Sequence, residues 1–156
     1  MVAVNNSEAV RVLHIYLETE IAAPIDIAWE AMLAEMGPEC VLPNSDDTPF
    51  PMVLEAWPGG RWYRDLGNDA GHLWGHVQVI KPSKLLEICG PLFMSYAVTN
   101  HLQYRLIEED GVTTMQMTHR GLGQIAQEVF DGANAGWGSR NQRIKDHAER
   151  LARQRN

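Results

Sequence analysis

Cysteine, positive charge and long apolar runs are all scarce in this sequence, and each shortage argues against a class of protein. Two cysteines occur, Cys40 and Cys89, without the spacing of a redox or metal pair, so we expect reduced thiols rather than a disulfide. Lys and Arg total 13 against 20 Asp and Glu, for a net charge of −7. This balance argues against nucleic acid as a partner, because phosphates need a basic face. No stretch approaches the roughly 20 apolar residues that span a bilayer, and residues 1–10 lack the pattern of a signal peptide, so the sequence predicts a cytoplasmic protein.

Motifs for nucleophilic, phosphate and metal chemistry are also missing. There is no Gly-x-Ser-x-Gly elbow and no glycine-rich phosphate loop with its lysine. His72 and His76 are four residues apart in a predicted strand, which separates them by about 13 Å, too far for one zinc ion. We therefore expect no catalytic nucleophile, no bound metal and no cofactor.

Short segments with alternating apolar and polar residues fill most of the chain. Residues 11–21 have the pattern of a half-buried strand, and Pro24 then suits the first turn of a helix over 25–36. A proline-rich loop over 37–51 follows and is predicted to cover one end of the sheet. Further strands are predicted at 52–57, 61–65, 72–80, 85–89, 98–108 and 112–120.

One long amphipathic helix is predicted over residues 123–155. Phe130, Trp137, Ile144 and Leu151 recur every seven residues, which places them on one stripe of an α-helix. That stripe must be buried, and strands in series supply an antiparallel sheet to accept it. The sequence thus predicts the α+β class: one domain over 1–156, with an ordered core at about 11–152 and six to seven strands.

Five motifs in order resemble one known family. They are 21–29 (IAAPIDIAW), 58–62 (PGGRW), Gly75-x-Val77-x-x-x-Lys81-Pro82, His119-x-Gly121 and Gly136-Trp137. Together they resemble the SRPBCC superfamily, also called START-like or birch-pollen-allergen-like, over residues 11–151. The most similar branch is the one named for homologues of the heat-shock protein ninety ATPase activator.

The resemblance implies the helix-grip fold, in which a curved antiparallel sheet wraps around the long C-terminal helix and leaves a cavity between them. Most members of the superfamily hold an apolar ligand in that cavity. Gly132, Gly136 and Gly138 each cost the helix roughly 1 kcal/mol relative to alanine, and in this fold they would make room beside Trp137. A chaperone regulator would be expected to carry a second domain, which these 156 residues leave no room for.

The candidate ligand-binding residues come from two predicted strands and the long helix. Alternation turns Met115, Met117 and His119 inward on one strand and Tyr104 on its partner, so that Tyr104 adds a hydroxyl to an apolar wall. From the helix come Phe130, Ala133 and Trp137.

Each candidate also has a structural interpretation. Methionine and aromatic stripes are more often core than pocket wall, and for His119 a hydrogen-bonded core histidine is the favoured interpretation over an acid, base or ligand contact. Arg140 lies on or beside the inward stripe. We expect it to be solvated, whereas an inward Arg140 would favour an anionic group.

Three functions are consistent with these observations. The preferred one is binding of a hydrophobic small molecule, without catalysis, between sheet and helix. The alternatives are a cyclase, aromatase or hydrolase that uses His119 or Tyr104, and a protein-interaction module such as a chaperone regulator. Outward aromatic side chains at Trp74 and Tyr16, with nearby histidines, further predict a homodimer.

Overall fold

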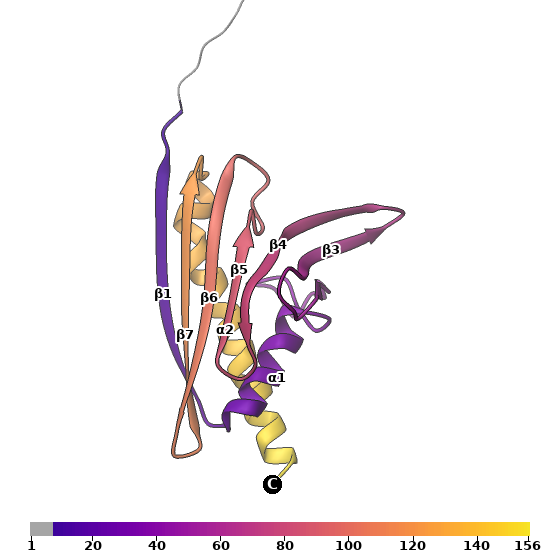
Figure 1. Cartoon of the computed structure of the whole chain (residues 1–156), viewed down its shortest axis with the longest axis vertical. Coiled ribbons are helices and arrows are strands. Elements are labelled where there is room, and N and C mark those ends of the chain that lie inside the picture. The colour runs from indigo at the N-terminus through magenta and orange to yellow at the C-terminus, as the bar shows by residue number, and fades with distance from the viewer. Residues whose placement is uncertain (1–7) are drawn as a thin grey trace, which may run out of the picture.

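A seven-stranded antiparallel sheet and two helices make up the computed structural model, which describes residues 8–156 (Figure 1). In chain order the elements are β1 (Arg11–Ile21), α1 (Ile25–Met36), β2 (Val53–Leu54), β3 (Arg61–Gly67), β4 (Ala70–Lys81), β5 (Leu85–Gly90), β6 (Val98–Glu109), β7 (Val112–Gly123) and α2 (Gln127–Gln154). Neighbours in the sheet follow the order β1-β7-β6-β5-β4-β3-β2. The first strand therefore pairs with the strand that leads into the long helix.

The long helix α2 runs along the curved sheet, and α1 packs beside it (Figure 1). This arrangement confirms the predicted α+β class and the predicted order of elements, with a short helix after the first strand and a long one at the end. A strand series cannot bury one face by itself, and the amphipathic α2 supplies the second layer.

The inner face of β6 and β7 carries the residues that alternation predicts. Met115, Met117 and His119 on β7 are fully buried, as is Tyr104 on β6. Tyr104 lies opposite Met117 in an unbroken ladder between the two strands. Because side chains along a regular strand alternate between faces, this local pattern alone sets which of them point inward.

Strand β4 departs from the predicted alternation at Trp74. This residue was expected to face outward, but it is only 5% exposed. In the pairing with β3, Trp62 lies opposite Gly75 and Tyr63 opposite Leu73, which leaves Trp74 as an extra residue. Such a bulge reverses the alternation along the strand, and it turns Trp74 onto the edge of the Trp62 ring, with centroids 4.9 Å apart. The homodimer prediction relied mainly on an exposed Trp74, and the burial of this side chain removes that support.

Helix α2 buries a stripe that confirms part of the sequence pattern and corrects the rest. Ala133, Trp137 and Ile144 are buried, whereas Phe130 is 40% exposed, with the Arg11 guanidinium 5.9 Å from its ring centre. Phe130 lies in the first turn of α2, where its ring is partly exposed. The expectation that it faces inward was wrong.

Among the helices in the part of the chain that the structure describes, none has the length and apolar character needed to cross a membrane.

Candidate functional site

A cavity of about 350 Å³ lies against the first half of α2. We call it the Trp137 cavity. The loop between α1 and β2 covers one side of it, and single aromatic residues from β4 and the β5–β6 loop cover another. Its lining consists of Leu42, Pro43, Asn44, Phe50, Trp74, Phe93, Glu128, Val129, Gly132, Ala133, Gly136, Trp137 and Arg140. Asn44 and Glu128 are exposed and Trp74, Trp137 and Arg140 are buried, so the cavity runs from a polar rim to an aromatic floor.

Two of the three predicted helix glycines line this cavity. A Cβ atom at Gly136 would meet the Pro43 Cβ at 3.8 Å, and one at Gly132 would meet no heavy atom of the described chain within 4 Å. Any larger side chain at these two positions would therefore project into the cavity. Gly138 has equally open surroundings within residues 8–156, but it is not part of the lining.

A hydrogen bond from Trp137 to His119 fixes the tryptophan ring at the floor of the cavity. The Trp137 Nε1–H donates to His119 Nδ1 at 2.9 Å, and His119 Nε2 lies 2.8 Å from Asn100 Oδ1. An indole N–H can only donate, so Nδ1 is the acceptor and the proton is on Nε2, which donates to Asn100. Burial lowers the pKa of His119 from 6.5 to about 4, which keeps the imidazole neutral at pH 7.

Asn100 completes this network and explains a glycine in the sequence. Its Nδ2 donates to the carbonyl oxygens of Gly90 and Pro91, each at 3.2 Å. A Cβ atom at Gly121 would lie 2.5 Å from Asn100 Oδ1. Only glycine therefore leaves room for the amide oxygen that accepts the hydrogen bond from His119. The His119-x-Gly121 spacing thus has a steric cause.

Tyr104 belongs to a second buried hydrogen bond. Its hydroxyl donates to Asn141 Oδ1 at 2.7 Å, and burial raises the pKa of the phenol above its ordinary value. Tyr104, Met115, Met117 and His119 are therefore buried outside the lining of the Trp137 cavity. Of the seven candidate ligand-binding residues, the structure brings Ala133 and Trp137 to the lining. A ligand role for the other five stays a prediction.

Arg140 is the cavity residue that the sequence interpretation placed wrongly. It was expected to be solvated, but it is 6% exposed and borders the cavity. Its Nη2 donates to Cys40 Sγ at 3.3 Å, while Nη1 has no hydrogen-bond partner in residues 8–156. The sequence did contain a signal for this burial: Arg140 follows Trp137 by three residues, which places both on the same face of the helix.

A group of acidic residues and a histidine joins the two helices on another side of α2. The ligand atoms of Glu35, Glu39 and His147 lie within 4.8 Å of one another, a spacing that suits a metal ion. However, Glu35 already bonds to Arg143 at 3.0 Å and to His147 at 2.8 Å. Its charge is compensated by these partners, so we interpret the group as an ion-pair network that ties α1 to α2.

No family model matches the chain, and no curated protein matches its sequence. Solved structures do match. A protein from Rhizobium leguminosarum described as uncharacterised has a TM-score of 0.73 at 17% identity, covering 93% of this chain and 99% of that one. The Zhui aromatase/cyclase from Streptomyces sp. R1128 has a TM-score of 0.60 at 16% identity, over 93% and 96% of the two chains. DynU16, a protein of the dynemicin biosynthetic locus, has a TM-score of 0.59 at 16% identity, over 87% of this chain and 47% of its own.

The chain has a helix-grip-like fold. The neighbours that carry this conclusion include an aromatase/cyclase. At identities of 12–17% in such matches, the likeness concerns the fold alone, and function must be argued from the site.

Proposed function

We propose that this protein binds a hydrophobic small molecule in the Trp137 cavity. The observation that carries the proposal is the cavity itself: about 350 Å³, near the lower end of the roughly 300–1,000 Å³ of small-molecule sites. Its walls are mainly apolar, with Trp74, Phe93 and Trp137 near the floor. An apolar cavity with a few polar groups is the usual composition of such sites.

The floor of the cavity is preorganised, which favours a ligand site over a packing defect. Trp137 is fixed by its bond to His119, and Phe93 packs edge-on against it with ring centres 6.3 Å apart. Rings that are already held in place lose little conformational entropy when a ligand binds. Glycine at 132 and 136 keeps the space open at a cost to helix stability of roughly 1 kcal/mol each.

The test uses a neutral aromatic probe and a variant that fills the cavity. We expect 2-naphthalenemethanol to bind the wild-type protein in isothermal titration calorimetry. Gly136→Leu should weaken this binding at least tenfold, because the new side chain occupies the probe's space. Gly138→Leu is the matched control, since it makes the same change in the same helix outside the lining. Equal binding by both variants would show that the probe sits elsewhere, and this would overturn the proposal.

The enzyme alternative is less well supported by the geometry. An aromatase/cyclase is among the structural neighbours, and a catalyst in this cavity needs an acid or base within hydrogen-bond reach of the substrate. His119 and Tyr104, the two candidates, are fully buried outside the lining. In the lining that the structure describes, the ionisable side chains are Glu128 at the rim and Arg140 at the floor. We therefore propose binding rather than catalysis.

Membership of the heat-shock activator branch, a chaperone as partner and a homodimer remain predictions. The chaperone contact and the homodimer would involve surfaces outside the cavity. Sedimentation at micromolar concentration checks the dimer, and stimulation of a chaperone ATPase would be needed to support the branch function.

A further inference from the structure

Arg140 combines burial, charge and an unused hydrogen-bond donor at the floor of the Trp137 cavity. Its guanidinium carbon lies 5.5 Å from the ring centre of Trp137, 5.8 Å from that of Trp62 and 5.9 Å from that of Trp74. These rings attract the cation, but they cannot accept a conventional hydrogen bond from it. Their indole N–H groups already donate to other residues. The Nη1 donor is itself buried and has no hydrogen-bond partner in residues 8–156.

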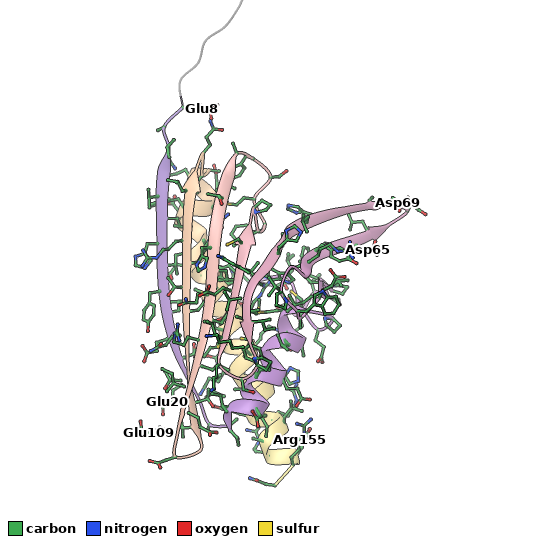
Figure 2. The ribbon with its side chains drawn as sticks, viewed as in Figure 1. Glu8, Glu20, Asp65, Asp69, Glu109 and Arg155 are labelled. Carbon is green, nitrogen blue, oxygen red and sulfur yellow. The ribbon has the colours of Figure 1, made fainter. Side chains whose placement is uncertain are left out.

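The charge of Arg140 has no ion-pair partner in the described chain. None of the carboxylates in residues 8–156 forms an ion pair with it within 4.0 Å. Glu35, on the neighbouring helix, is held by Arg143 and His147. Figure 2 shows Asp65 and Asp69 on the β3–β4 hairpin, and Glu20 and Glu109 at the opposite end of the sheet.

A buried guanidinium in this state favours an anion. Arginine stays charged in proteins, and a buried charge without a partner is unfavourable until an opposite charge and hydrogen bonds compensate it. In the lining that the structure describes, Arg140 is the sole cation and Glu128 adds a negative charge at the rim. A ligand with one negative charge would balance the single positive charge of Arg140, whereas Glu128 would repel a second negative charge. The cavity therefore suits a monoanion rather than a phosphate.

We propose that the ligand is an apolar or aromatic carboxylic acid whose carboxylate pairs with the Arg140 guanidinium while its apolar part fills the Trp137 cavity. This assignment rests on the proposed function and adds the polar end of the ligand to it. The hydrophobic body contacts the aromatic floor, and the carboxylate supplies the charge that the protein lacks there.

The test compares three probes that share one ring system. They are 2-naphthoate, 2-naphthalenemethanol and 2-naphthyl phosphate, titrated calorimetrically at pH 7 and constant ionic strength. A charge-assisted hydrogen bond in a buried site corresponds to a preference of about tenfold to a hundredfold. We expect 2-naphthoate to bind tighter than the alcohol by this factor, and tighter than the phosphate.

Substitution of Arg140 locates the source of the preference. Arg140→Met keeps the length of the side chain and removes its charge, so it should bind 2-naphthoate and the alcohol equally well. Arg150→Met is the control, because it makes the same change at an exposed position of α2 and should keep the preference. We also measure Arg140→Gln, and the melting temperatures of all variants show that they are folded. Loss of an uncompensated buried charge should leave the melting temperature unchanged or higher.

Each remaining outcome overturns the assignment in a distinguishable way. If the wild type binds the alcohol as tightly as the acid, or if Arg140→Met keeps the preference, the carboxylate proposal fails and cavity binding stands. Tighter binding of the phosphate would refute the monoanion. If none of the three probes binds, both this assignment and the proposed function fail.

Discussion

The buried imidazole of His119 should make the stability of this protein depend on pH between 4 and 6.5. Burial lowers its pKa from 6.5 to about 4, and its side chain is fully buried. Below pH 6.5 His119 is protonated in the unfolded chain but stays neutral in the folded protein. The free energy of unfolding therefore falls as the pH falls. Below about pH 4 both states are protonated and the loss stops growing. At about 1.36 kcal/mol per pKa unit, the full loss is about 3 kcal/mol.

Besides burial, the hydrogen bonds of His119 oppose its protonation. Its Nδ1 accepts from Trp137 and its Nε2–H donates to Asn100, so a second ring proton would meet the indole N–H directly. Protonation should therefore also release Trp137 from the floor of the cavity. Changes in tryptophan fluorescence near pH 4 would report this release.

The assay is urea denaturation of the wild type and His119→Gln at several pH values from 7 to 4. Glutamine does not titrate, so the difference between the two proteins isolates His119 from groups that titrate in both. We expect the wild type to lose about 3 kcal/mol more than the variant across this range. Equal slopes would refute the reasoning, as would a histidine signal for His119 that titrates near pH 6.5 by NMR.

Further predictions concern buried contacts. Tyr104→Phe leaves its buried amide acceptor without a donor and should cost about 1–3 kcal/mol, whereas Tyr16→Phe, at an exposed hydroxyl, should change stability by less than about 0.5 kcal/mol; similar effects in urea denaturation would contradict the role of the buried bond. Gly121→Ala forces a Cβ to within 2.5 Å of Asn100 Oδ1 and should cost about 1–3 kcal/mol. Gly138→Ala has open space in the described structure and should stabilise the helix by up to about 1 kcal/mol. If both alanine variants shift the urea midpoint in the same direction, the steric argument is wrong.

Local patterns in the sequence were sufficient for the architecture and for the inner faces of the long strands. Alternation predicted that Met115, Met117, His119 and Tyr104 point inward, and the structure confirms this because the β6–β7 ladder is unbroken. The position of the long helix followed from its apolar stripe. These features depend on side-chain periods of 2 and 3.6, which are properties of the segments themselves.

The tertiary structure alone decided the orientation of Trp74 and the state of Arg140. The bulge at Trp74 arises from its pairing with β3, and a pairing is not encoded in the alternation of one strand. Arg140 is buried because tryptophans from β3, β4 and α2 meet around it. The sequence placed it near the inward face of the helix, but whether a charge there reaches solvent depends on what the other elements bring to it. The same holds for the cavity, whose wall joins a loop, two aromatic side chains and a helix that are distant along the chain.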